Sequence, residues 1–105
     1  MQGQKRLDAA PLRAIGTEPF WNARIVGRCI TYSHPENPKG TRLWTRLSEA
    51  PDGPVWSGAL DGRLFELRLS AAPGCSDGMS DKLYPMSVDL IVGGERRRGC
   101  AEPAS

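Results

Sequence analysis

Several features that carry chemistry in other proteins are scarce or missing in this chain of 105 residues. No apolar run approaches the roughly 20 residues that a helix needs to span a bilayer. His34 is the sole histidine, and the three cysteines lack the Cys-x-x-Cys spacing of common zinc sites. No phosphate-binding loop and no complete set of nucleophile, base and orienting residue can be assigned. The sequence therefore predicts no catalytic residue, no metal and no cofactor.

An excess of charge of either sign is also missing, because 14 lysines and arginines face 12 aspartates and glutamates and leave a net charge of +2. Such a balance does not by itself indicate a nucleic-acid or membrane partner. Arg96–Arg98 together with Arg42, Trp44 and Arg46 could form the basic, aromatic surface of a single-stranded nucleic-acid binder. Neighbouring side chains of a strand point to opposite faces, however, so Arg97 would not share that surface. We expect a solvated face and no nucleic-acid partner.

The opening segment, Met1–Pro11, lacks the apolar core of a signal peptide. It mixes charge, alanine and proline without a sustained period, which is typical of a mobile tail, and we expect residues 1–14 to form one. If the protein is exported, the leader has been removed, and the precursor could carry a lipid anchor. We expect residues 15–101 to form a single domain and residues 102–105 a frayed end.

What the chain does have is turn chemistry and alternation. Its 12 glycines and 9 prolines suit many turns between short segments better than a few long helices. Apolar and polar residues alternate, no helical period is visible, and the dipeptides Asp61-Gly62 and Gly93-Gly94 are typical of tight hairpins. The alternation predicts about seven short strands. They are Phe20–Gly27, Arg28–Ser33, Thr41–Ser48, Val55–Leu60, Arg63–Ser70, Met86–Val92 and Glu95–Ala101.

This pattern predicts an all-β fold, a small antiparallel barrel or sandwich. A barrel is favoured, because closure removes exposed sheet edges in a chain too short to cover them with helices. Residues 71–85 hold two prolines, two glycines and Cys75, and we expect them to form a long loop with at most one helical turn near Ser76–Lys82. His34–Gly40 consists of turn-forming residues and is also expected to be a loop.

The three cysteines allow three different single bridges, and sequence alone does not choose among them. Gly74 beside Cys75 and Gly99 beside Cys100 would let two backbones approach closely. A bridge between Cys75 and Cys100 would close a loop of about 25 residues and stabilise the fold by about 3 to 4 kcal/mol on the chain-entropy model. Cys29 would then remain a free thiol on a strand. The alternative is that all three cysteines are reduced and buried.

Two segments have the character of motifs. The first is Gly16–Trp21, with the sequence GTEPFW, and the second is Cys75–Asp81, with the sequence CSDGMSD, accompanied by Gly99–Ala101. They resemble the signature of an uncharacterised family of bacterial envelope proteins and lipoproteins, found mainly in proteobacteria. The resemblance covers residues 15–33 and 75–101. It implies export to the periplasm or tethering at the outer membrane, a β-rich fold and a Cys75–Cys100 disulfide, and it implies no particular reaction.

Each motif also has a reading from its residues. Glu18-Pro19 predicts an extended entry to a strand on which Phe20 and Trp21 point to opposite faces, so one of the two rings is exposed and a candidate for binding. The simpler interpretation places Trp21 in the core. Asp77 and Asp81 are four residues apart and could share a face. Loop capping is favoured over a cation site there, because Ca²⁺ needs six or more oxygen ligands.

Together these features favour a noncatalytic module that binds a protein, a glycan or a small ligand through Gly74–Pro85 and the aromatic edge near Trp21. A narrower hypothesis, from architecture alone, is inhibition of a lysozyme. The remaining alternatives are an enzyme that uses the carboxylates of Asp77 and Asp81, and a structural role in the bacterial envelope. The candidate binding residues are Trp21, Tyr32, Asp77, Met79, Ser80, Asp81 and Tyr84.

Overall fold

The computed structural model describes residues 11–17, 19–79 and 81–104, and within them the chain forms nine strands and no helix. The strands are β1 (Leu12–Thr17), β2 (Phe20–Val26), β3 (Cys29–His34), β4 (Asn37–Trp44), β5 (Arg46–Ala50), β6 (Gly53–Leu60), β7 (Arg63–Ser76), β8 (Leu83–Val92) and β9 (Glu95–Pro103). The all-β prediction is therefore confirmed, with more strands than expected. No helix of the described residues is long and apolar enough to cross a membrane.

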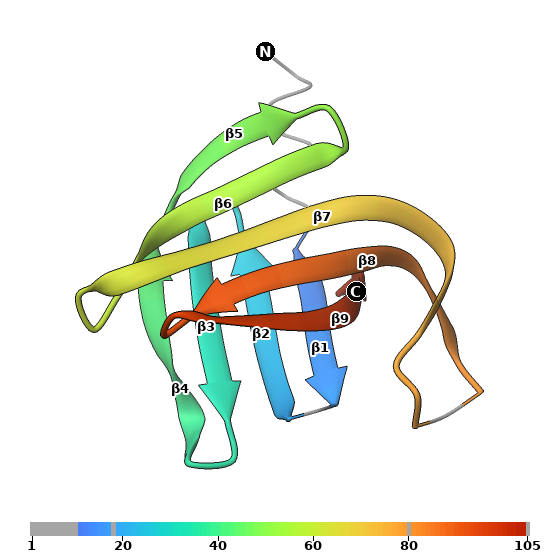
Figure 1. The fold of residues 1–105 in the computed structure, drawn as a ribbon, viewed down its shortest axis with the longest axis horizontal. Coiled ribbons are helices and arrows are strands. Elements are labelled where there is room, and N and C mark those ends of the chain that lie inside the picture. The colour runs from blue at the N-terminus through green and yellow to red at the C-terminus, as the bar shows by residue number, and fades with distance from the viewer. Residues whose placement is uncertain (1–10, 18, 80, 105) are drawn as a thin grey trace.

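All nine strands belong to one antiparallel sheet, in the order β4-β3-β2-β1-β9-β8-β7-β6-β5. Each strand pairs with its neighbours in the chain, except that β1 also pairs with β9 and that β4 and β5 form the two edges. Figure 1 shows the sheet curled into a half-barrel, with the chain passing from one edge strand to the other between β4 and β5. Thr45 marks this passage, and its backbone N–H donates to the Arg28 carbonyl at 2.8 Å.

The core follows from alternation. Along β2, for example, Trp21, Ala23 and Ile25 are buried while Phe20 and Val26 are exposed, as the sequence pattern predicts for a half-buried strand. Facing strands add the same kind of side chain, and packing them between the two halves of the curled sheet removes their apolar surface from water. The buried cluster is Ala14, Trp21, Ala23, Ile25, Ile30, Tyr32, Leu43, Trp56, Phe65, Leu67, Leu69, Val88, Leu90, Val92 and Ala101.

The boundaries at the two ends differ from the expected ones. β1 begins at Leu12, inside the segment expected to be a tail, and Ala14 is completely buried. β9 continues to Pro103, inside the expected frayed end. β1 pairs along its whole length with β2, and the stretch from Leu12 opposite Pro103 to Ile15 opposite Cys100 also pairs with β9. The pairing with β9 joins the two ends of the described chain, which local patterning does not reveal. Residues 1–10 and 105 lie outside the described residues.

The long loop expected at 71–85 is replaced by a hairpin. β7 runs through Ser76 and β8 starts at Leu83, and Cys75 pairs with Tyr84 beyond a register shift after Ala71. We call the part of this hairpin beyond Ala71 and Met86 the hairpin tip. It lies at the end of β7 and the start of β8, where both strands bend (Figure 1). The bulge absorbs the proline and glycine that the sequence pattern reads as a loop. The helical turn expected there is absent from its described residues.

Two further expectations change in a similar way. The single strand expected over Thr41–Ser48 is divided at Thr45 into β4 and β5, and β4 already starts at Asn37, within the segment expected to be a loop. The Cys75–Cys100 disulfide is formed, and Cys29 remains a free, partly buried thiol. Ala101 faces the core, so the neighbouring Cys100 points to the outer face of β9, where the bridge pins the hairpin tip.

Candidate binding site at the hairpin tip

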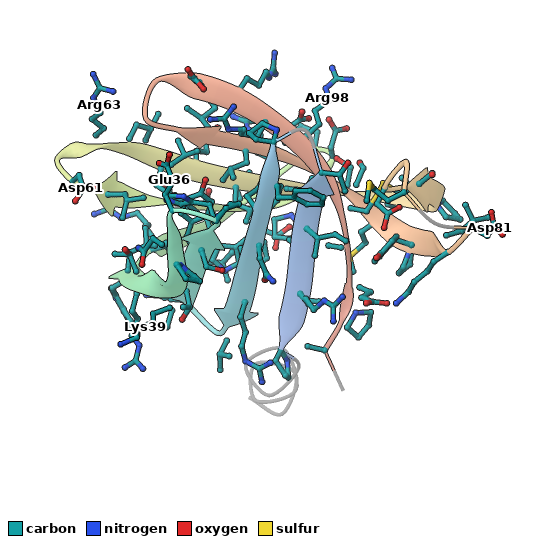
Figure 2. The ribbon with its side chains drawn as sticks, turned by 90° about the horizontal axis from the view of Figure 1, so that it is seen from below. Glu36, Lys39, Asp61, Arg63, Asp81 and Arg98 are labelled. Atoms are coloured by element: carbon teal, nitrogen blue, oxygen red, sulfur yellow. A yellow bond between two sulfur atoms is a disulfide. The ribbon has the colours of Figure 1, made fainter. Side chains whose placement is uncertain are left out.

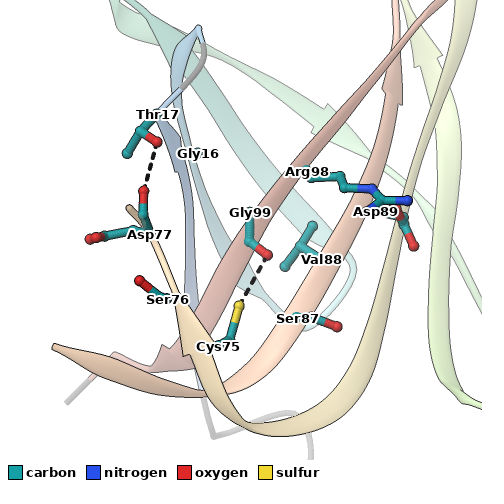
Figure 3. Close-up of a pocket in the computed structure, with 10 residues that line it drawn as sticks. All are labelled: Gly16, Thr17, Cys75, Ser76, Asp77, Ser87, Val88, Asp89, Arg98 and Gly99. Carbon is teal, nitrogen blue, oxygen red and sulfur yellow. Dashed lines mark hydrogen bonds and ion pairs between the residues drawn. The ribbon is translucent and has the colours of Figure 1, made fainter. Parts of the chain in front are cut away.

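The two sequence motifs meet at the hairpin tip, although they are far apart in the chain. The hydroxyl of Thr17, at the end of β1, donates to the carbonyl oxygen of Asp77 at 2.7 Å across a separation of 60 residues (Figure 3). The disulfide holds the same segment to β9 two residues earlier. Thus one hydrogen bond and one covalent bond fix the hairpin tip over the outer face of β1 and β9.

Glycines of both motifs make room for one indole ring. A Cβ atom on Gly16 would overlap the indole nitrogen of Trp21, and a Cβ atom on Gly99 would overlap the carbonyl oxygen of Ile15 and press on the same ring. Trp21 is buried in the core, so the simpler interpretation is confirmed, and the aromatic residue that reaches the surface is Phe20, which is 51% exposed. Trp21 itself is therefore a supporting residue of the site and not its contact surface.

Asp77 organises the turn of the hairpin tip. One carboxylate oxygen accepts the backbone N–H of Met79 at 2.9 Å, and the other accepts the hydroxyl of Tyr84 at 3.3 Å. The hydroxyl of Ser76 accepts the N–H of Gly78 at 3.1 Å, and Gly78 has a φ of 80°, which a glycine adopts without strain. These bonds give Asp77 the loop-capping role that the sequence analysis favoured.

The environment of Tyr84 keeps its hydroxyl protonated. Burial raises the pKa of Tyr84 above its ordinary value, and the negative charge of Asp77 raises it further, while Lys82 acts in the opposite direction. The ammonium of Lys82 lies 4.9 Å from the centre of the Tyr84 ring and pairs with Glu102 at 3.0 Å. Near neutral pH, Tyr84 is therefore a hydrogen-bond donor to Asp77 and not an acid that releases a proton.

Two hollows adjoin the hairpin tip. The first, of about 540 Å³, lies between the tip and strands β8 and β9 and is shown in Figure 3. Its border carries the pair Arg98–Asp89, with 3.7 Å between Nε and Oδ1. The sulfur of Cys75 lies 3.5 Å from the Gly99 carbonyl oxygen, and since a disulfide sulfur carries no proton this is a close contact and not a hydrogen bond. This hollow is a polar crevice behind the disulfide.

The second hollow, which we call the apolar hollow, has a volume of about 400 Å³ and lies on the other side of Thr17 and Asp77. Apolar side chains from separate segments of the chain line it, together with polar residues including His34, Asn22 and Asp77. Met79 is 66% exposed beside it. Its apolar members are Ile15, Phe20, Trp21, Pro35, Pro38 and Met79.

The lining residues His34, Pro35 and Pro38 come from a segment whose sequence signals only a turn, and they were not among the candidate residues. Of the candidates, Asp77, Met79 and Tyr84 are brought together at the hairpin tip. Ser80 lies outside the described residues.

Asp81 is exposed at the far end of the hairpin tip, as Figure 2 shows, and points away from the barrel. Among the described residues, no three histidine, cysteine, aspartate or glutamate side chains gather in a way that could hold a metal ion.

Tyr32 belongs to a different part of the molecule. It is buried in the core, with its ring centre 5.7 Å from that of Phe65 and 5.6 Å from that of His34. Burial raises the pKa of its hydroxyl, and the nearby guanidinium of Arg97 partly offsets this effect. Tyr32 and Arg97 line a hollow of about 550 Å³ at one end of the barrel, separate from the apolar hollow except for His34. Tyr32 thus does not share a contact surface with the hairpin tip.

No family model matches the chain, and searches of curated proteins and of solved structures find no match.

Proposed function

We propose that the chain is a noncatalytic binding module of the bacterial envelope, and that its apolar hollow receives a large apolar side chain from an extended segment of a partner protein. The observation that carries the proposal is that Phe20 and Met79, both more than half exposed, flank a hollow that the Thr17–Asp77 hydrogen bond holds in shape. Exposed apolar side chains of this size are costly in water unless a partner covers them.

The composition of the hollow favours a protein partner over a glycan. Its lining includes proline, aromatic and methionine side chains, together with hydrogen-bonding groups such as those of Asn22, Ser33 and Asp77. Protein interfaces combine apolar and polar contacts in this way, and a single buried anchor side chain often supplies most of the affinity. A volume of about 400 Å³ is sufficient for one such anchor.

Pre-organisation supports the same proposal. The Cys75–Cys100 disulfide and the contacts of Asp77 fix the hairpin tip before any partner arrives, so little conformational entropy is lost on binding. The acid–base alternative has less support, because Asp77 is engaged in the turn and Asp81 points away from the barrel. A disulfide is typical of oxidising compartments, which supports export and, with the family resemblance, a periplasmic or outer-membrane-tethered location.

A peptide-display selection against the disulfide-intact chain tests the proposal directly. We expect selected peptides to share an aromatic or long aliphatic residue and to bind at least about tenfold more weakly to a Phe20→Ala, Met79→Ala double variant. Leu83→Ala is the matched control, because Leu83 is 61% exposed on β8 and does not line the apolar hollow. Both variants alter exposed side chains and should fold normally.

The proposal is overturned if no peptide is enriched, or if the selected peptides bind the double variant as tightly as the parent chain. Inhibition of a lysozyme remains a narrower prediction of the same kind. A lysozyme activity assay with the parent chain and the Phe20→Ala, Met79→Ala variant decides whether that enzyme is the partner.

A further inference from the structure

A second surface, unrelated to the hairpin tip, lies where β4 passes into β5. Trp44 ends β4 with 72% of its surface exposed, more than any other large hydrophobic residue among those that the structure describes. It lines a hollow of about 630 Å³ together with the half-exposed Leu64 of β7, Arg28 and Arg46. We call the surface formed by Arg28, Trp44, Arg46 and Leu64 the Trp44 corner.

The sheet register places further apolar and basic residues on the same outer face, next to this surface. Val26 stands opposite Cys29, and Cys29 stands opposite Trp44, so exposed Val26 lies in the same cross-strand row as Trp44 on the outer face. In the adjacent outward row, Arg24 and Arg42 flank Thr31. Strands lie about 4.8 Å apart, which places the Cα atoms of Arg24 and Arg42 about 10 Å from each other.

Within the described part of the chain, the arginines of this region are not neutralised by ion pairs. Among the described residues, none of Arg24, Arg28, Arg42 and Arg46 takes part in an ion pair. Glu66 lies in the same cross-strand row as Arg46, with Ser57 between them, and it is paired with Arg68 at 2.7 Å. The corner therefore presents unneutralised positive charge around a protruding indole.

We propose that the Trp44 corner docks the protein on an anionic lipid bilayer. Tryptophan favours the interface between headgroups and acyl chains, and guanidinium groups bind phosphate oxygens in bidentate fashion. Each basic residue near an anionic surface strengthens attachment, and an apolar side chain that enters the interface adds to it. The Trp44 corner supplies both kinds of residue on one outer surface.

A bilayer fits the corner better than single-stranded nucleic acid does. Nucleic-acid surfaces stack bases on flat aromatic rings, whereas two of the three apolar side chains here, Val26 and Leu64, are aliphatic and offer no stacking face.

The placement of the corner is compatible with the binding module. Pro38, at the start of β4, lines the apolar hollow, while Trp44 ends the same strand, about 20 Å away at the usual rise per residue. Docking through Trp44 therefore leaves the apolar hollow uncovered. The inference does not depend on the proposed function of that hollow.

Trp44 is also the reporter for the experiment, because Trp21 and Trp56 are buried. The full chain is mixed with vesicles of phosphatidylcholine alone, or of equal parts phosphatidylcholine and phosphatidylglycerol. We expect a blue shift of tryptophan emission and co-sedimentation with the anionic vesicles only, both weakened by added salt. Trp44→Ala should abolish the shift and weaken co-sedimentation.

A matched pair of charge variants separates docking from general attraction. Arg28→Gln with Arg46→Gln should weaken binding to the anionic vesicles by about thirtyfold. Arg96→Gln with Arg98→Gln removes the same charge from β9, three strands beyond β3 in the sheet order, and should have little effect. Figure 2 shows Arg98 projecting from the outside of the barrel.

The proposal is overturned by any of three results. The first is absence of binding to anionic vesicles, and the second is an equal loss in the two double variants. The third is tighter binding to a single-stranded oligonucleotide than to the vesicles at the same salt concentration, which would assign the corner to nucleic acid instead.

Discussion

The hairpin tip and the Trp44 corner are both held against the rest of the sheet, but by different interactions. The hairpin tip lies on the outer face of β9 and is held by a disulfide and by the hydroxyl of Thr17. The corner lies against the core and is held by hydrogen bonds of buried residues, in which Thr45 Oγ1 donates to the Arg28 carbonyl at 2.7 Å and Trp56 Nε1 to the Gly27 carbonyl at 2.9 Å.

The difference follows from burial. Thr45 and Trp56 are almost completely buried, so the apolar surface around them adds to the strength of the corner. Most described residues of the hairpin tip are exposed or partly exposed, with Tyr84 as the exception. A segment with so little apolar area to bury cannot offset its ordering entropy by packing, and a covalent link that restricts the unfolded chain supplies the stability instead.

Removal of the disulfide should have the largest effect. Cys75→Ala with Cys100→Ala should lower the free energy of unfolding by about 3 to 4 kcal/mol, because the unfolded chain regains the entropy of a loop of about 25 residues. Urea denaturation measures the loss. Hydrogen exchange should show faster opening of the hairpin tip than of the corner. Equal acceleration in both regions would contradict the comparison, and Cys29→Ala serves as the control for loss of a free thiol.

Substitution of Gly99 should have the second largest effect. Gly99→Ala places a methyl group against the Ile15 carbonyl and the Trp21 ring, so β1 and β9 must separate or the indole must move, at a cost of about 1 to 3 kcal/mol. Gly74→Ala is the matched control, because a Cβ atom there meets nothing within 4 Å. Thermal unfolding of the two variants checks this, and similar melting temperatures would show that the glycine is not needed for packing.

Two hydroxyl deletions compare the regions directly. Thr17→Val removes the bond to Asp77, and Thr45→Val removes one of two bonds to the Arg28 carbonyl, which still accepts the backbone N–H of residue 45. Each change should cost about 0.5 to 1.5 kcal/mol, measured by chemical denaturation. Only Thr17→Val should weaken peptide binding at the apolar hollow. If Thr45→Val weakens it equally, the two regions are coupled and the comparison fails.

The smallest effect should appear at high pH. Burial and Asp77 raise the pKa of Tyr84 in the folded chain, so the unfolded state loses its proton first. The stability contributed by neutral Tyr84 is complete below about pH 10 and falls as the pH rises above that value. The melting temperature should drop as the pH rises above about 10, and less steeply in Tyr84→Phe. Some decline will remain, because burial also raises the pKa of Tyr32. An unchanged slope in the variant would contradict this role of Tyr84.

Much of the sheet can be predicted from local sequence. Asp61 and Gly62 both have positive φ, 54° and 77°, as the Asp-Gly dipeptide predicts for a tight hairpin, and Gly93 and Gly94 behave likewise with 60° and 80°. The alternation of β2 predicts its buried face correctly. In each case the signal and its cause lie within a few neighbouring residues, so no knowledge of distant contacts is required.

The parts that local sequence missed depend on distant contacts. The end of β9 is held as a strand by its pairing with β1, and the hairpin tip is extended because Cys75 pairs with Tyr84. The candidate site shows the same limit. Asp77, Met79 and Tyr84 were identified from their own segment, whereas the approach of Thr17 and of the turn containing Pro38 depends on how the sheet curls. The disulfide partner of Cys75 was implied by resemblance and not by spacing.

The seam between β1 and β9 has a consequence for the architecture of the chain. The N–H of Ala104 donates to the carbonyl of Pro11 at 2.9 Å, so the first and last described residues lie side by side. A short linker could join these two points and new ends could be opened at the Gly93-Gly94 turn without altering any strand pairing. In such a circular permutant the order of the strands along the chain would change while their order in the sheet remained. The curl of the sheet would then depend on which strands pair and not on where the chain begins.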